Sequence, residues 1–286
     1  MNNTVKSASG RHSRHKVKIF LTYAVIIIAI TFIVLPILSM ISTSLIPRNV
    51  LYKSDLNIFK ELTLQNYQFV IAKTNIPLNM LNSFLIAAIA TLICTVISSL
   101  AAYALSRVKS KFFTFYAFFL IILYTFPLML MIIPLFSLFK QFGLTNSRLS
   151  VVIAYVAINL PFSIWMMRGI FNGISNEIEE SALVEGASLL RAFFRIIVPI
   201  AVPGLASVAI FTFIFSWNEF MFANIFLTSD AIKPVTVGVQ AFMQQFDRQW
   251  TLLMAASTLS TIPVAIFIIF TQKYIVQGLT AGAVKG

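Results

Sequence analysis

Long runs without a charged residue alternate with short polar segments along this chain of 286 residues. The uncharged runs are residues 19–47, 74–106, 149–167 and 249–272, and two further apolar stretches cover residues 112–139 and 202–227. A helix needs about 20 apolar residues to cross a bilayer. The pattern therefore predicts six membrane-spanning helices joined by polar segments, which is an all-α polytopic membrane protein.

Prolines and small residues distinguish individual spans. Pro127 and Pro134 predict a kink in the third span, because proline removes a backbone hydrogen bond. Asn82-Ser83 is expected to open the second span. Small residues then repeat at helical spacing, which lets helices approach closely in lipid; they are Ala87, Thr91, Cys94, Ser98 and Ala102.

Composition supports a membrane location, since 59% of the residues are hydrophobic and only 10% are charged, against about 25% charged in soluble domains. For so apolar a chain, the net charge of +12 fits a cytoplasmic membrane face better than nucleic acid binding. Cys94 is the only cysteine, so one chain forms neither a disulfide framework nor a cysteine-based metal site. His12 and His15 lie in a basic segment, where a solvated tail is favoured over metal binding.

The N-terminal segment, residues 1–18, is a basic tail in front of the first span. A cleaved signal peptide is disfavoured, because signal cores have about 7–15 apolar residues and residues 19–41 exceed that length. Six spans place both termini on one side of the membrane. The basic tail, together with a modest excess of Lys and Arg on the same side, predicts that both termini are cytoplasmic.

The segment from Glu177 to Gly204 differs from the rest of the chain. It holds four of the nine acidic residues, and apolar spans lie on both sides of it. Asn176 and Glu179 fit a capping box, which predicts a helix start. Gly186 is expected to end this helix with a positive φ.

A second short helix is expected directly afterwards. Ser188 can cap its N-terminus, and Pro199 is expected to break it. The result is a partly apolar helix-turn-helix between two spans. Such a segment suits a contact with another protein at the membrane surface.

The residue arrangements of an enzyme are missing from the sequence. No glycine is followed directly by lysine, so the Walker A phosphate loop is absent. No His-Asp-Ser set or metal-ligand spacing occurs within the spans. If ATP drives this protein, a partner hydrolyses it, and no cofactor is expected.

Glu219 is the acidic residue expected inside a span, beside Trp217 and Asn218. An acid at a helix centre costs about 2.5–3.5 kcal/mol on insertion scales. Glu219 therefore lines a polar pathway or reaches water near the outer interface, where tryptophan is also common, and the pathway is favoured. Asn159, close to Pro161, lines such a pathway or hydrogen-bonds between helices; the sequence favours neither.

One motif carries a family resemblance. The EAA loop of binding-protein-dependent ABC importer permeases reads Glu-Ala-Ala, three residues, Gly, nine residues and Ile-x-Leu-Pro. This chain is similar to it at Glu180-Ser181-Ala182, Gly186, Ile196, Val198 and Pro199. Ser181 replaces an alanine and Val198 replaces the leucine.

Other pieces resemble the smaller permease subunit of maltose-type carbohydrate importers within this class. They are Asn66-Tyr67, Asn82-Ser83, Trp217-Asn218-Glu219-Phe220 and the C-terminal run from Val276 to Gly286. The C-terminal run is the most specific to that subfamily, and it points to sugars rather than to amino acids or metals.

The resemblance implies a type I ABC importer permease fold in the bacterial plasma membrane, with a cytoplasmic EAA coupling helix. It also implies that this chain forms half of the transmembrane pathway of a sugar importer. The implied partners are a second homologous permease, a pair of ATPase subunits and an extracytoplasmic solute-binding protein. The implied ATPase-coupling residues are Glu180, Ser181, Ala182, Glu185, Gly186 and Ala187.

The chain then divides into a tail (1–18), the first span with an outer loop (19–75), a core permease domain (76–273, with the EAA loop at 175–199) and a cytoplasmic tail (274–286). The last outer loop, residues 229–249, is expected to approach the binding protein. An ion-coupled secondary transporter, a permease for a non-sugar solute and a membrane scaffold or sensor are the alternatives. One acid within six spans gives an ion-coupled carrier little support.

Overall fold

The computed structural model describes residues 5–48, 50–51, 62–108, 110–244 and 249–281. The ends of both expected tails and parts of the loops expected on the outer side, including Asp55 and Gln245, lie outside these residues. All regular elements in the described ranges are helical. They are α1 (Val5–Ser44), α2 (Gln65–Lys73), α3 (Ile76–Arg107), α4 (Lys111–Tyr124), α5 (Leu128–Gln141), α6 (Arg148–Asn172), α7 (Asn176–Val184), α8 (Leu189–Ala192), the π-helical turn η1 (Phe193–Ile197), α9 (Val198–Asn218), α10 (Met221–Phe226), α11 (Val235–Gln244) and α12 (Trp250–Ala281).

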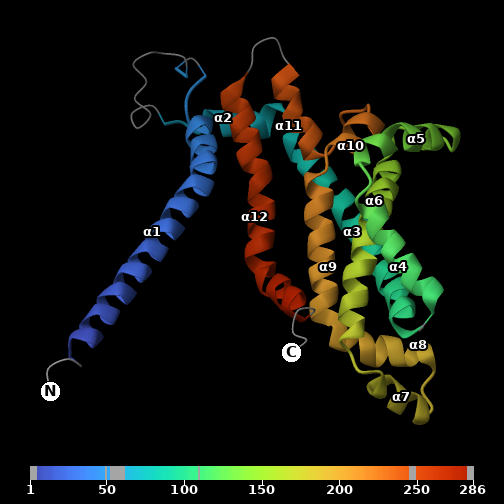
Figure 1. Ribbon diagram of the computed structural model, residues 1–286. Helices are drawn as coiled ribbons and strands as arrows, with labels where there is room; N and C mark the ends of the chain where they lie inside the picture. The colour runs from blue at the N-terminus through green and yellow to red at the C-terminus, as the bar shows by residue number, and fades with distance from the viewer. Residues whose placement is uncertain (1–4, 49, 52–61, 109, 245–248, 282–286) are drawn as a thin grey trace.

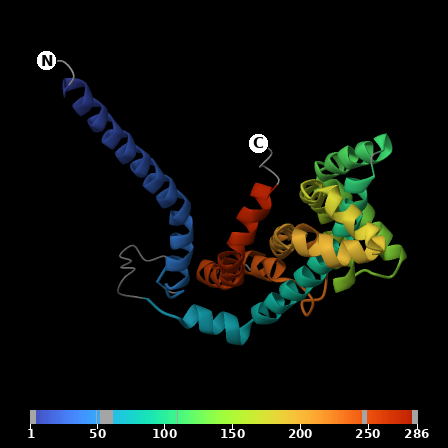
Figure 2. The same cartoon turned by 90° about the horizontal axis from the view of Figure 1, so that it is seen from below.

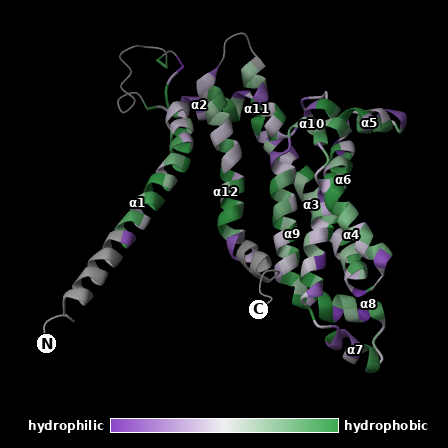
Figure 3. Cartoon of the chain, viewed as in Figure 1, coloured by the Kyte–Doolittle hydropathy of each residue, from purple (hydrophilic) through white to green (hydrophobic). Residues whose placement is uncertain are grey.

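The long helices run between two ends of the molecule (Figure 1). At the lower end of Figure 1 lie α7 and α8, together with the start of α1 and the end of α12; at the upper end lie α2, α5, α10 and α11. Hydrophobic residues cover much of the long helices, whereas hydrophilic residues gather on α7 (Figure 3). Both described ends of the chain therefore lie at the α7 end, as six spans require.

Five of the expected spans are long apolar helices, within Lys18–Ser44, Ile76–Arg107, Arg148–Asn172, Leu189–Asn218 and Trp250–Tyr274. The third expected span differs, because α4 and α5 meet at 96°. The bend occurs just before α5, at Pro127, which is the N-cap residue of α5, whereas Pro134 lies inside α5. The sequence predicted a kinked helix there; the structure has two helices, and α5 lies across the upper end (Figure 1).

The second span begins earlier than predicted. α3 starts at Ile76, where Thr74 Oγ1 accepts a hydrogen bond from the Ile76 backbone N–H at 3.2 Å. Pro77 follows in the first turn, where its missing N–H costs nothing. Asn82 lies within α3 instead of opening it, and its amide donates to the carbonyls of Ala231 and Lys233 at 3.0 Å.

The small residues of α3 form the close packing that the sequence predicts. α3 packs against α6 and α9, and Ala87, Cys94, Ser98 and Ala102 are fully buried. Thr91 is the half-buried member of the series. Where the three helices meet, Cys94 Sγ donates to Ser163 Oγ at 3.3 Å. These side chains are too small to hold the helices apart, so α3, α6 and α9 form the centre of the bundle.

The first span stands apart from that centre. Figure 2 shows α1 well separated from α3, α6 and α9 along most of its length. The apolar part of α1 buries no residue within the chain. At the upper end, however, the buried Asn66 of α2 donates two hydrogen bonds of 2.8 Å, to the carbonyls of Ser44 and Ile46. These bonds and a hydrogen bond of 2.5 Å between the Ser44 and Tyr67 hydroxyls join α1 to α2. α1 also packs against α12, and the rest of its surface is left for lipid or a partner.

Candidate functional site

The turn between α7 and α8 begins with a different cap from the predicted one. Ser175, not Asn176, is the N-cap residue, and its Oγ accepts from the Glu177 backbone N–H at 3.2 Å. Asn176 is the first helical residue. Glu179 does not complete a capping box, because its carboxylate points at another helix. The predicted helix is present, but the capping box is wrong.

Gly186 ends α7 as predicted, with φ at +86°. Its N–H donates to the Leu183 carbonyl at 3.0 Å, and the Ala187 N–H donates to the Ala182 carbonyl at 3.0 Å. This pair of bonds is a Schellman motif, which requires a left-handed residue at the glycine position. Ser188 then caps α8 and accepts from the Arg191 N–H at 3.4 Å, as the sequence predicted.

Pro199 does not break the second helix. The helical backbone runs unbroken from Leu189 to Asn218. The π-helical turn η1 ends at Ile197, two residues before Pro199. A proline ring normally clashes with the carbonyl four residues earlier, and a wider turn gives that ring room. The prediction of a break was therefore wrong, and α8 leads directly into the fifth span.

The expected coupling residues divide into exposed and inward-facing positions. Glu180, Ser181, Glu185 and Gly186 are exposed, Ala187 is half-buried, and Ala182 is 6% exposed. Ala182 packs against its own chain, so a larger side chain there would displace α7. Large apolar side chains lie exposed around them: Leu183, Val184, Leu189 and Leu190, of which Val184 is 89% exposed.

An ion pair that the sequence did not predict attaches α7 to the end of α3. Glu179 Oε2 accepts from Arg107 Nε at 2.7 Å, and Glu179 Oε1 accepts from the Tyr103 hydroxyl. Arg107 Nη1 also donates to the Phe171 carbonyl of α6 at 3.2 Å. Both charged side chains are largely buried, with 14% exposure for Arg107 and 9% for Glu179. The group of Tyr103, Arg107 and Glu179, here called the α7 clamp, therefore joins three helices.

Glu179 and Glu180 are adjacent in the sequence but differ in burial. The sequence gives both as acids in the first turns of one helix, and only the tertiary packing shows that Glu179 is buried and Glu180 exposed. The sequence offered one signal for a buried partner of Glu179, namely a basic residue at the end of an earlier span. Arg107 ends the uncharged run of the second span, but without a structure nothing linked it to Glu179.

Glu219 lies in a break of the fifth span rather than inside a helix. α9 ends at Asn218, Glu219 is extended with ψ at 134°, and α10 begins at Met221. The Glu219 carboxylate accepts from the backbone N–H groups of Phe222 at 2.9 Å and Ala223 at 3.4 Å. It thus caps α10, where an anion is favourable. The two interpretations from the sequence, a pathway residue or a residue near the outer interface, both placed Glu219 inside a span. The bonds to the α10 backbone explain how this half-buried acid is tolerated.

The other pathway candidates lie in different settings. Trp217 is buried and stacks on Phe213, with ring centroids 6.0 Å apart. Asn218 is exposed, and its amide donates to the Ile214 carbonyl at 2.8 Å. Asn159 is buried, and its amide donates to the Tyr155 carbonyl of its own helix at 2.7 Å. The hydrogen bond of Asn159 thus lies within α6 and not between helices.

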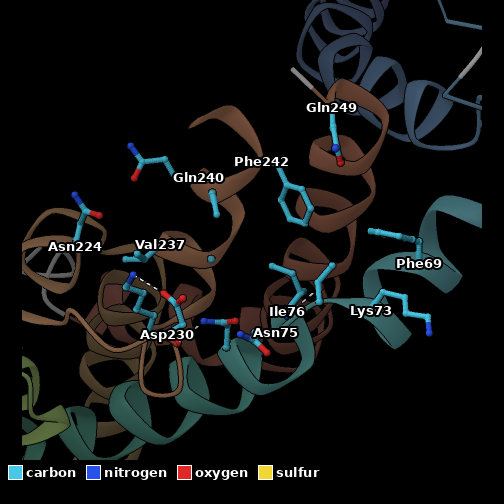
Figure 4. Close-up of a pocket in the computed structure, with 15 residues that line it drawn as sticks. Phe69, Lys73, Asn75, Ile76, Asn224, Asp230, Val237, Gln240, Phe242 and Gln249 are labelled. Carbon is cyan, nitrogen blue, oxygen red and sulfur yellow. Dashed lines mark hydrogen bonds and ion pairs between the residues drawn. The ribbon is translucent and has the colours of Figure 1, made fainter. Parts of the chain in front are cut away.

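A pocket of about 360 Å³ opens at the upper end (Figure 4). The end of α2, the start of α3, α10, α11 and the segment before α11 line it. Lys233 Nζ donates to Asp230 Oδ1 at 2.6 Å at its edge. Its other polar groups are mostly amides, from Asn75, Asn79, Asn224, Gln240 and Gln249.

Known proteins resemble the chain in sequence and in fold. The trehalose/maltose transport system permease protein MalG of Thermococcus litoralis is 39% identical over 227 residues, which cover 78% of this chain and 82% of that protein. The sulfoquinovosyl glycerol transport system permease protein SmoH of Agrobacterium fabrum is 34% identical over 224 residues, which cover 78% of this chain and 79% of that protein.

Among solved structures, a bacterial ABC transporter that imports the acidic polysaccharide alginate contains a similar chain. Its TM-score is 0.76 at 21% identity, and the match covers 91% of this chain and 96% of that one. This likeness confirms the type I importer permease fold. Residues 95–281 match the family model of binding-protein-dependent transport system inner membrane components, and the chain belongs to that family.

Proposed function

We propose that the chain is the permease subunit of an ATP-driven sugar importer and that its α7–α8 turn docks onto a separate ATPase. One observation carries this proposal. An exposed surface with apolar and acidic residues, including Val184 and Glu180, is attached to the membrane helices by the α7 clamp. A surface of this kind suits a protein partner, and its attachment suits the transmission of movement.

The docking residues have separate tasks in this proposal. Glu180, Ser181 and Glu185 meet the ATPase, while Gly186 and Ala187 set the turn that presents them. Ala182 fixes α7 to its own chain. An exposed ion pair with the ATPase contributes about 0–1 kcal/mol, so the shape of the turn matters more than its charge.

The assembly pairs this chain with a second homologous permease, two ATPase subunits and an extracytoplasmic binding protein. The lower end of Figure 1, with the start of α1 and the end of α12, faces the cytoplasm. The upper end, with residues 229–244, faces the binding protein. The sides of α1, outside the core domain of residues 76–273, contact lipid or the second permease.

The pathway runs beside the break between α9 and α10. A broken helix at membrane depth occurs where backbone is buried in protein or lines a cavity. Asn218 and Glu219 lie at this break and face the pathway, and Trp217 and Asn159 support the helices behind them. Because both Glu219 oxygens already accept backbone hydrogen bonds, an ion-coupled carrier gains no support from this acid.

Sugars are the proposed substrates because the relatives include permeases named for trehalose/maltose and sulfoquinovosyl glycerol. The test is uptake by the purified complex in lipid vesicles, with trehalose, maltose, maltotriose and an amino acid as solutes. Sugar uptake that needs internal ATP and the binding protein supports the proposal. Uptake driven by an ion gradient without ATP, or amino acid uptake alone, contradicts it.

A further inference from the structure

We propose that the upper pocket binds one glycosyl unit of a neutral sugar or oligosaccharide. This proposal rests on the proposed import function, which supplies the solute. The volume of about 360 Å³ lies at the lower end of the range for small-molecule sites, about 300–1,000 Å³. The pocket therefore has room for one sugar ring rather than for a long chain.

The polar lining matches hydroxyl groups. A side-chain amide offers two donors and an acceptor, and a sugar hydroxyl both donates and accepts. Asn79 is engaged in the structure, since its amide donates to the Lys233 carbonyl at 2.7 Å. Asn75, Asn224 and Gln240 make no side-chain hydrogen bond with the part of the chain that the structure describes. These three amides are available to a ligand, and Figure 4 shows that they come from separate elements around the pocket.

The charges of the pocket favour a neutral ligand. Asp230 and Lys233 form an ion pair, which leaves less charge for an ionic ligand. Lys73, at the end of α2, adds a donor that suits a hydroxyl. Since the amides outnumber the charged groups, hydroxyl recognition dominates the lining.

Apolar groups complete the site. Ile76, Val237 and the largely buried Phe242 present carbon surface to the pocket. Phe69 adds an aromatic ring, which the Arg48 guanidinium covers at 4.0 Å from the ring centroid. Ligand sites combine such apolar walls with a few polar groups, and the C–H faces of a sugar ring need both.

The floor of the pocket is tightly built. A Cβ on Gly238 would lie 3.0 Å from Asn79 Cγ, so α11 approaches α3 closely at this point. Asn79 is 3% exposed. The site therefore lies on the bundle rather than on a loose loop, at the end opposite α7. A sugar presented from that side meets the pocket before it reaches the spans.

Saturation-transfer NMR with the full chain in lipid nanodiscs tests the site directly. Nanodiscs avoid alkyl-glycoside detergents, whose headgroups would compete. Maltose and trehalose are the neutral probes and glucuronate is the acidic one. We expect saturable binding of at least one neutral probe. The double variant Asn75→Ala/Gln240→Ala should weaken it about tenfold, because it removes two neutral hydrogen bonds.

Two further variants make the test decisive. Ala241→Trp places a large side chain at an exposed lining position and should abolish binding. Gln68→Ala removes an exposed amide of α2 that does not line the pocket and should leave binding unchanged. The proposal is overturned if neither maltose nor trehalose shows saturable binding, or if Ala241→Trp binds the sugar as well as the unchanged chain does. Tighter binding of glucuronate than of both neutral sugars overturns the neutral class.

This measurement is independent of the transport proposal, since it uses neither ATP nor another subunit. Binding with no ATP-driven uptake refutes the import function and leaves the site intact. Uptake with no binding to the isolated chain refutes the site and leaves the import function intact.

Discussion

Arg107 Nε lies 2.7 Å from Glu179 Oε2, so the end of the second span and the helix of the α7–α8 turn are joined by an ion pair. The Tyr103 hydroxyl and the Phe171 carbonyl complete the arrangement. A force on α7 therefore acts on α3 and α6 without a flexible connection. In the proposed importer, this contact carries the movement of the ATPase to the membrane helices.

Glu179→Ala should uncouple the importer, because it removes the link and leaves Arg107 without its carboxylate. Removing one partner of a buried ion pair costs about 3–5 kcal/mol, so a loss of thermal stability is expected as well. Co-purification of the ATPase should persist, while stimulation of ATP hydrolysis by the binding protein falls. Glu180→Ala, at the exposed neighbour, is the matched control for stability. Normal coupling in Glu179→Ala would show that the clamp is only a structural contact.

Glu219→Ala and Glu219→Gln should differ. Alanine removes the cap of α10, which costs about 0.5–2 kcal/mol, whereas glutamine keeps one acceptor oxygen for the Phe222 N–H. We expect Glu219→Ala to assemble with reduced stability and impaired transport, and Glu219→Gln to keep most of the stability. Transport lost in Glu219→Gln at normal stability would assign a role to the charge in the pathway. Normal transport in both variants would contradict a pathway role.

How far the sequence predicts this structure depends on the range of the interactions. Uncharged runs located the spans because the bilayer acts on each helix separately. Gly186 was predictable because the turn that needs it is local. The break at Glu219 was not predictable, because a glutamate that caps a helix and a glutamate buried inside a span have the same sequence pattern. The bend at Pro127 and the partner of Glu179 depend on packing between distant segments, which periodicity does not report.

Gly204→Ala should destabilise the contact between α6 and α9. A Cβ at this position would lie 2.4 Å from Cδ1 of Ile170, and overpacking typically costs about 1–3 kcal/mol. The double variant Gly204→Ala/Ile170→Ala should recover part of that loss, because the obstructing side chain is gone. Gly169→Ala, which meets no atom within 4 Å, is the control. Thermal unfolding in nanodiscs would refute this packing if Gly204→Ala and Gly169→Ala melted alike.

Labelling of single cysteines with a membrane-impermeant maleimide should report the orientation. In a Cys94→Ser background, cysteines at Thr145 and Gln240 should react in intact cells. Cysteines at Lys111 and Leu190 should react only after permeabilisation. Thr145, Lys111 and Leu190 are exposed and Gln240 is half-buried, so each thiol is accessible from its own side. The inverted pattern would place the α7–α8 turn outside the cell.

Co-purification of the ATPase with Gly186→Val tests the docking role of the α7–α8 turn most directly. Gly186 has φ at +86° with open space around it, so valine strains the Schellman turn without a steric clash elsewhere. Gly143→Val is the matched control, since Gly143 has φ at +68°, also meets nothing within 4 Å and lies between α5 and α6. The ATPase should be lost, with sugar uptake, from Gly186→Val and retained by Gly143→Val, both chains being inserted in the membrane. Wild-type recovery of the ATPase and normal uptake with Gly186→Val would contradict the docking role of this turn.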